Sequence, residues 1–270
     1  MTGRLLTRRS IPALVAALSL GASSAADAST VRVSGGNTLV IADAANEVNV
    51  LTFWRVADTD DGDQVIMVRQ STGPNDLPQD WPEDMPFEPE PNTPILGDLL
   101  NGCVPEPDNG NVVRCTATGK FEAVNANLGG NTDFISNPSS ITNAQPLDPD
   151  TVVTLAGEAG NDVLLGSPNG DFLIGGDGDD DLRGNAGADT LRPGNGQNTL
   201  RGGSELDTVE FHGADRSKAN VNSAVTLDGI ANDGAECNTA IGQQNIPGAC
   251  ERNNVHVDVE NVTTGNGNDV

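Results

Sequence analysis

Six units of nine residues follow one another from Gly157 to Glu210, and each unit repeats the same arrangement of residue types. The sixth position holds an acidic or amide residue: Asp162, Asp171, Asp180, Asp189, Asn198 and Asp207. The eighth position holds an apolar residue: Leu164, Leu173, Leu182, Leu191, Leu200 and Val209. A strict repeat of this kind predicts a solenoid in which each unit packs mainly on its neighbours.

Each unit divides into a turn and a short strand. Its first residues are mostly Gly, Asn and Asp, which favour tight turns, and its last three place one apolar side chain between two more polar ones. Two units then make one full coil, so alternate units stack about 4.8 Å apart. We expect a first edge that carries Asp162, Asp180 and Asn198, and a second edge that carries Asp171, Asp189 and Asp207.

Stacked carboxylates indicate a metal ion. Two charges about 5 Å apart repel by roughly 1 kcal/mol in water, and by more where water is excluded. One apolar side chain per unit offsets little of the conformational entropy lost on folding, so we expect the metal-free repeats to be largely unfolded. Oxygen-only ligands favour Ca²⁺ over zinc or copper, and folding would then accompany binding. A flexible Gly/Asp-rich linker is the alternative, and the unbroken apolar series argues against it.

These units resemble the nonapeptide repeats of the RTX, or haemolysin-type, calcium-binding family. The unit from Gly175 to Arg183 matches the signature G-G-x-G-x-D-x-U-x at every fixed position. The resemblance implies an all-β fold built as a right-handed parallel β-roll or β-helix solenoid. It also implies that calcium is bound by the sixth-position residues and by backbone carbonyls of the turns. We therefore assign metal-binding roles to the six sixth-position residues and to Gly160, Gly175, Gly176, Gly178 and Gly187.

Several positions depart from the family pattern. Asn198 lacks a charge, so its site should be weaker. Asn169 and Glu205 replace the fourth-position glycine; Asn tolerates the left-handed conformation, whereas Glu205 suggests a distorted last unit. Residues 128–135 look like a degenerate repeat with Asp133 in the sixth position. Residues 264–270 begin another unit, which adds Asp269 as a metal-binding candidate.

The first 28 residues are predicted to be a signal peptide. Arg4, Arg8 and Arg9 precede an apolar run over 11–20, and residues 26–28 fit a small-x-small cleavage site. The run is too short to span a bilayer, and no second long apolar run follows. We expect a secreted, extracellular protein with no membrane span. Its formal net charge of −25 disfavours nucleic acid as a partner.

Residues 29–156 are predicted to form a β-rich N-terminal region. Short alternating runs over 31–33, 39–41, 48–56 and 65–68 read as strands. Turns are expected at 34–37 and 60–62. A proline-rich, acidic loop is expected over 71–94, because its prolines exclude helix and central strand.

Four cysteines suit an oxidising compartment. Three pairings are open, and the two local disulfides, Cys103–Cys115 and Cys237–Cys250, are the simplest. Zinc binding is the competing interpretation, but neither a C-x-x-C motif nor a nearby histidine supports it. We interpret residues 211–263 as a spacer that contains the second disulfide loop; it resembles the spacers between repeat blocks in actinobacterial members of the family.

The usual catalytic motifs are missing, including H-E-x-x-H, G-x-S-x-G and the P-loop. We therefore expect a non-enzymatic structural or adhesive scaffold that binds calcium ions, with a surface, a glycan or a protein as its open second partner. Two alternatives stay open. The chain could be the carrier segment of a larger secreted enzyme, or a β-helix enzyme that acts on carbohydrate through carboxylates.

Overall fold

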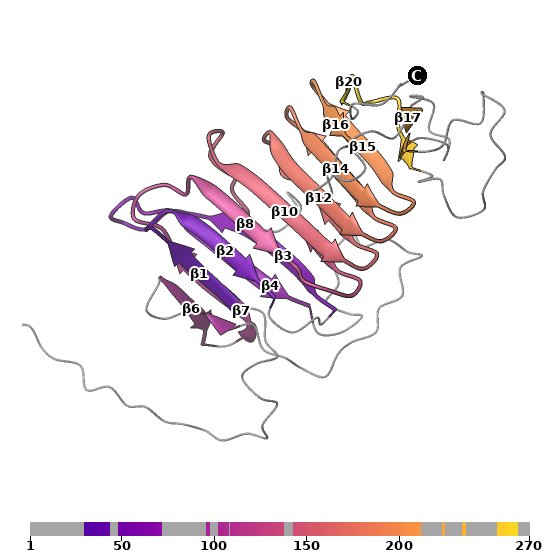
Figure 1. The fold of residues 1–270 in the computed structure, drawn as a ribbon. Helices are drawn as coiled ribbons and strands as arrows, with labels where there is room; N and C mark the ends of the chain where they lie inside the picture. Colours follow the sequence, from indigo (N-terminus) through magenta and orange to yellow (C-terminus); the bar gives the residue numbers. More distant parts are fainter. Residues whose placement is uncertain are drawn as a thin grey trace, which may run out of the picture.

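The computed structural model describes residues 30–43, 48–71, 96–97, 102–107, 109–137, 143–211, 223–224, 234–235 and 253–263. Within these ranges the chain forms strands and turns, which confirms the all-β prediction. Two nine-stranded sheets face one another along most of the molecule, and Figure 1 shows strands β8, β10, β12, β14 and β16 of the first sheet side by side.

The first sheet contains, in spatial order, β20 (Asn261–Thr263), β16 (Thr208–Glu210), β14 (Thr190–Asn195), β12 (Asp171–Asp177), β10 (Val152–Ala159), β8 (Ala123–Asn127), β2 (Thr38–Ala42), β1 (Thr30–Ser34) and β5 (Leu96–Gly97). The second contains β19 (Asn254–Val255), β15 (Thr199–Ser204), β13 (Asp181–Ala186), β11 (Val163–Leu165), β9 (Phe134–Ser136), β3 (Val50–Val56), β4 (Val65–Gln70), β7 (Asn109–Thr116) and β6 (Cys103–Glu106). A separate antiparallel pair joins β17 (Ser223–Ala224) to β18 (Gly234–Ala235).

The repeat units alternate between the two sheets, as predicted. In the first sheet, Leu155 pairs with Leu173 and Leu173 with Leu191, while in the second Leu164 pairs with Leu182 and Leu182 with Leu200. All these pairings are parallel and join residues 18 apart. We call this parallel part of the two sheets the stack, and each of its levels a rung.

The stack begins before the repeats, which confirms that the rung-like sequence around Asp133 belongs to it. β9 pairs in parallel with β11, and β8 with β10. One rung further up, β2 pairs with β8 and β3 with β9. Beyond them the pairing becomes antiparallel: β1 covers β2, and β4, β7 and β6 extend from β3. We call the antiparallel strands β1, β4, β7 and β6 the cap. The predicted turn 34–37 connects β1 to β2, and the predicted turn 60–62 connects β3 to β4.

The stack also continues after the repeats, within the range that we interpreted as a spacer. β19 pairs with β15 and β20 pairs with β16, both in parallel. We call residues 253–263 the returning segment, because they rejoin the stack after a long insertion. The spacer interpretation missed them because residues 253–263 do not follow the nine-residue period.

The core lies between the two sheets. The eighth-position residues are fully buried there, and they continue into Leu51, Ile135 and Val255 at the equivalent positions of the second sheet. Each strand buries alternate side chains, as expected for a strand with one face on the core. A continuous apolar series therefore holds the rungs in register.

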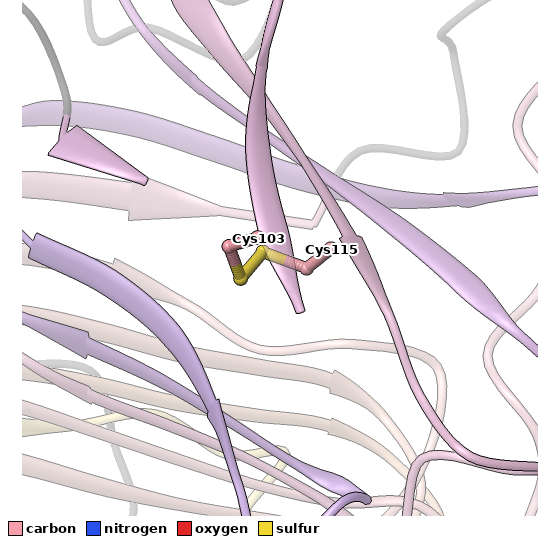
Figure 2. Close-up of a disulfide and its surroundings, with 2 residues drawn as sticks. All are labelled: Cys103 and Cys115. Carbon is pink, nitrogen blue, oxygen red and sulfur yellow. A yellow bond between two sulfur atoms is a disulfide. The ribbon is translucent and has the colours of Figure 1, made fainter. Parts of the chain in front are cut away.

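A disulfide joins Cys103 of β6 to Cys115 of β7, and Figure 2 shows the bond between the two strands. The two residues lie directly opposite each other, with 4.1 Å between their Cα atoms. This confirms the first local pairing. The predicted Cys237–Cys250 disulfide, the signal peptide, the loop over 72–94 and Asp269 lie outside the described residues.

Candidate metal centre in the stacked turns

Glycine conformation allows the turns to stack closely. Gly176 and Gly178 have φ values of 121° and 142°, which side chains of L-residues rarely allow. A Cβ on either would overlap the carbonyl oxygen of Glu158 or Gly160 in the adjacent turn. In this unit, the second and fourth positions therefore need glycine for two reasons: the backbone conformation and the space between rungs.

The sixth-position side chains form a hydrogen-bonded ladder along the first edge. In each step, the backbone N–H of one rung donates to the side-chain Oδ1 of the next. The steps are Asn49 to Asp133 at 2.6 Å, Asp133 to Asp162 at 2.7 Å, Asp162 to Asp180 at 2.9 Å, Asp180 to Asn198 at 2.8 Å and Asn198 to Asn253 at 3.0 Å. The predicted order of Asp162, Asp180 and Asn198 is confirmed, and the ladder extends beyond them in both directions.

The second edge carries a shorter ladder. The backbone N–H of Asp171 donates to Asp189 at 2.8 Å, that of Asp189 to Asp207 at 2.9 Å, and that of Asp207 to Oε2 of Glu260 at 2.8 Å. Upstream of Asp171, the equivalent positions are the apolar residues Val153, Val124 and Leu39. The two edges are therefore unequal, a difference that the nine-residue period does not reveal.

The second carboxylate oxygen of most ladder residues has no hydrogen-bond partner. This holds for Oδ2 of Asp133, Asp162, Asp180, Asp189 and Asp207, all of them buried. An unpaired buried acceptor costs about 1–3 kcal/mol, and a charged one costs more. A row of such oxygens is what a cation-binding edge requires, and it is costly without a cation.

Three turns bring further oxygen atoms to these carboxylates. A Cβ built on Gly157 would meet both Oδ2 of Asp162 and the carbonyl oxygen of Gly175 in the next rung. The same convergence occurs at Gly175 and at Gly184. The partners are Oδ2 of Asp180 with the carbonyl of Pro193, and Oδ2 of Asp189 with the carbonyl of Gly202. Glycine at the first position leaves room for carboxylate and carbonyl oxygens to meet, and these hard donors suit Ca²⁺.

Asp171 differs from the other aspartates of the repeats. The Ser167 hydroxyl donates to its Oδ1 at 2.9 Å, and the Ser167 backbone N–H donates to its Oδ2. Asn169, at the fourth position of the same unit, does not adopt the left-handed conformation; its Nδ2 donates to the carbonyl of Asp148 at 2.8 Å. Asp171 is the first carboxylate along the second edge, and both of its oxygens are therefore paired with a residue of its own unit.

Asn198 also differs. Its Nδ2 donates to Oδ1 of Asn253 at 2.8 Å, so it leaves no unpaired acceptor toward that rung. Pro193 replaces the first-position glycine in the same unit. The fifth unit therefore lacks both the unpaired carboxylate oxygen and the first-position glycine that accompany Asp162, Asp180 and Asp189. Glu205 does adopt a positive φ, of 86°, so the last unit keeps its turn despite that residue.

Burial raises the pKa of the ladder carboxyls. The pKa is raised to about 6 at Asp162, about 7 at Asp171 and Asp180, about 8 at Asp189 and about 9 at Asp133. Loss of solvation is the main cause in each case, and the hydrogen bond from a neighbouring backbone N–H opposes it. A nearby positive charge would reverse this shift.

Among the described residues, no group of three or more His, Cys, Asp or Glu side chains is arranged to hold a metal ion. Each repeat turn brings one buried carboxylate, so a metal ion held there would take its other ligands from backbone carbonyls. Of the glycines that the sequence analysis assigned to metal binding, Gly160, Gly178 and Gly187 lie in these turns, and Gly175 and Gly176 lie near the end of β12. Sequence reasoning did not assign Asn49, Asn253 or Glu260 to the ladder, because no periodic spacing marks them.

Three arginines on the outer faces of the repeat strands pair with carboxylates. Arg183 and Arg201 lie side by side, as predicted, and both contact Asp181. On the other sheet, Arg192 contacts Glu210 and lies over the Phe172 ring. These arginines therefore offset carboxylates on the surface and do not reach the buried ladders.

The buried aspartate ladders and the glycine turns define a repeat segment, with rows of buried carboxylates, inside two mostly parallel sheets. Residues 154–182, 165–200 and 174–209 match the family model described as RTX calcium-binding nonapeptide repeat (4 copies). Residues 154–209 therefore carry calcium-binding RTX repeats with a buried aspartate ladder. The match does not support the narrower actinobacterial grouping. Neither the curated proteins nor the solved structures include a match to this chain.

Proposed function

We propose that this protein is a secreted, non-enzymatic scaffold whose RTX repeats form a right-handed parallel β-roll when they bind calcium. The observation that carries the proposal is the convergence at Gly157, Gly175 and Gly184. At each, an unpaired buried carboxylate oxygen and a carbonyl oxygen of the next rung both lie against the space where a Cβ would be. Asp162, Asp180 and Asp189 would hold the ions together with the turn carbonyls.

The role of calcium follows from the electrostatics of the edges. Bound Ca²⁺ would neutralise the carboxylates and satisfy the unpaired oxygens. The chain contributes the geometry: backbone N–H groups of the preceding rung hold Oδ1 of Asp162, Asp180 and Asp189, which leaves Oδ2 of each unpaired. The apolar series between the sheets then sets the spacing of the rungs.

An extracellular location supports this function. RTX repeats and a disulfide are typical of secreted proteins. Extracellular calcium modules bind with dissociation constants of about 10⁻⁴–10⁻³ M, so the repeats would be empty during synthesis and loaded outside the cell. No helix in the described ranges could cross a membrane. A structural or adhesive role, with a surface, glycan or protein as partner, would use the stiffness that calcium confers.

Far-UV circular dichroism of the full chain tests the proposal. We expect the β signal to rise when millimolar Ca²⁺ is added to the chelated protein and to fall when chelator is returned. Mg²⁺ serves as the matched ion, because its smaller octahedral shell fits flexible carbonyl sites poorly. A spectrum that Ca²⁺ leaves unchanged, with no heat of binding by calorimetry, would contradict the proposal.

A further inference from the structure

The outer face of the first sheet contains a continuous area without charge. Side chains that alternate with the buried ones in a strand point away from the core, and here they are half-buried or exposed. The uncharged ones in β2, β8, β10, β12 and β14 are Thr38, Val40, Ala42, Ala123, Asn125, Asn127, Val152, Thr154, Ala156, Phe172, Ile174 and Thr190. We call this area the neutral face. Charged residues border it: Arg32 in β1, Glu158 near the end of β10 and Arg192 in β14.

The strand register arranges the neutral face in straight rows. One row consists of Val40, Asn125, Thr154, Phe172 and Thr190, each directly opposite the next in parallel pairing. Adjacent strands lie about 4.8 Å apart, so the row repeats at that interval along the stack. Its amide and hydroxyl groups alternate with apolar groups on an even surface.

The absence of charge is not a property of the repeat itself. In the second sheet, the equivalent outer positions include Asp181, Arg183 and Arg201, whose side chains form ion pairs on the surface. The chain as a whole has a formal net charge of −25. The neutral face is therefore a local departure from an acidic surface, and it favours a partner that is itself uncharged.

Charge and size narrow the choice of partner. A nucleic acid or a second copy of this acidic chain would be repelled over long distances. From the spacings of strands and residues, the neutral face measures roughly 20 Å along the stack and roughly 15 Å along the strands, or about 300 Å². A stable protein–protein interface takes about 800 Å² from each partner. The neutral face is thus too small for a second copy and suits a narrow chain.

We propose that the neutral face binds an uncharged polysaccharide that lies along the stack. Sugar hydroxyls donate and accept hydrogen bonds, and the Asn125 amide and the Thr154 and Thr190 hydroxyls can do both in return. The C–H groups of sugar rings pack on apolar side chains, and Val152 offers one that is 52% exposed. The inference rests on the proposed function, because it names the partner and the surface of the adhesive role.

The test uses the full chain in millimolar Ca²⁺ and an array of uncharged glucans, mannans, galactans and xylans, with alginate and heparin as charged comparisons. We expect retention on an uncharged glycan and none on alginate or heparin. Titration calorimetry on the retained glycan then measures the Thr154→Val/Thr190→Val variant, which removes two hydroxyls and keeps the β-branched shape. Its dissociation constant should rise roughly tenfold or more. Val152→Arg, at an exposed position, should abolish retention, because it places a long charged side chain on the face.

Thr199→Val is the matched control. Thr199 occupies the seventh position of its unit, as Thr190 does, but it lies on the second sheet, so the affinity should not change. Circular dichroism with and without chelator checks that each variant keeps its calcium-dependent fold. No retention on any uncharged glycan would overturn the inference, as would an equal loss from Thr199→Val or full retention by Val152→Arg.

The same measurements separate this inference from the proposed function. A wild type that gains β signal with calcium and binds no uncharged glycan refutes this inference alone. A wild type that neither gains β signal nor binds Ca²⁺ refutes the proposed function.

Discussion

The Asn198 side chain donates a hydrogen bond of 2.8 Å from its Nδ2 to Oδ1 of Asn253, which joins the fifth repeat unit to a segment 55 residues away. This contact closes the lower end of the first edge without an ion. At the upper end, Asn49 plays a similar part: its Nδ2 donates to Oδ1 of Asp133 at 3.1 Å. The first-edge aspartates with unpaired oxygens, Asp133, Asp162 and Asp180, lie between these two amides.

The fifth unit should become a calcium site when both of its exceptional residues are restored to the family pattern. In the Pro193→Gly/Asn198→Asp variant, we expect one more bound ion than in the wild type, counted by native mass spectrometry. The aspartate restores the carboxylate, and the glycine provides the space found at Gly157, Gly175 and Gly184. Each single variant should bind the wild-type number; a gain from either one alone would show that the two positions act separately.

Asp180 and Asp171 should differ in their importance for calcium. Because Oδ2 of Asp180 is unpaired, Asp180→Asn should raise the calcium concentration at half-saturation by roughly tenfold or more. Asp171→Asn should have a smaller effect, since Ser167 already donates to both of its carboxylate oxygens. Titration calorimetry of both variants measures the difference. Asp150→Asn, at an exposed turn outside the ladders, is the control. Equal effects at Asp180 and Asp171 would contradict the assigned role of Ser167.

Gly175→Ala should weaken both calcium binding and the calcium-loaded fold. The added Cβ would overlap Oδ2 of Asp180 and the carbonyl of Pro193. Overpacking of this kind typically costs about 1–3 kcal/mol. Thermal unfolding in calcium measures the loss, with Ser204→Ala, at an exposed position of β15, as the control. A variant with wild-type stability and ion number would show that this space is not needed.

The calcium-free fold should be more stable in acid than at neutral pH. The pKa is raised to about 6 at Asp162, about 7 at Asp180 and about 8 at Asp189, against an ordinary value of 3.8. A raised carboxyl pKa means that the folded chain prefers the protonated form. The stability that these protonated carboxyls contribute is fully present below about pH 4. It is lost as the pH rises through the pKa values that the carboxyls have in the folded state.

Circular dichroism of the chelated chain between pH 4 and pH 9 measures this effect. We expect β signal at pH 4 that declines toward pH 8, and calcium should restore it there, because the ion replaces the protons. Repetition at high salt separates the buried ladder from surface repulsion, since salt screens exposed charges far more than buried ones. Equal β content at pH 4 and pH 8 in chelator would contradict the prediction.

Removal of the disulfide should destabilise the antiparallel cap and leave calcium binding unchanged. Cys103 and Cys115 are 12 residues apart, and closure of a loop of about that size contributes roughly 3 kcal/mol. Denaturant unfolding of the Cys103→Ala/Cys115→Ala variant in calcium measures the loss. The ion count should match that of the wild type, because neither cysteine lies in a ladder turn. A lost ion would mean that the cap supports the metal-binding edges.

The nine-residue period was sufficient to predict much of the repeat region. It placed Asp162 and Asp180 on one edge and Asp189 and Asp207 on the other, because strand and turn lengths are local properties. The degenerate unit around Asp133 was also recognisable, since it keeps the acidic sixth position and an apolar eighth position. The local disulfide followed from the short spacing of its cysteines.

The sequence by itself therefore determined the residues that repeat: the aspartates, the glycines that let turns stack, and the leucines between the sheets. Only the tertiary structure decided where the ladders end. Asn49, Asn253 and Glu260 reach their positions by parallel pairing across long insertions, and such pairing leaves no period in the sequence. The physical reason is that an exposed strand edge accepts any segment whose apolar side chains fit the core, however far along the chain that segment lies.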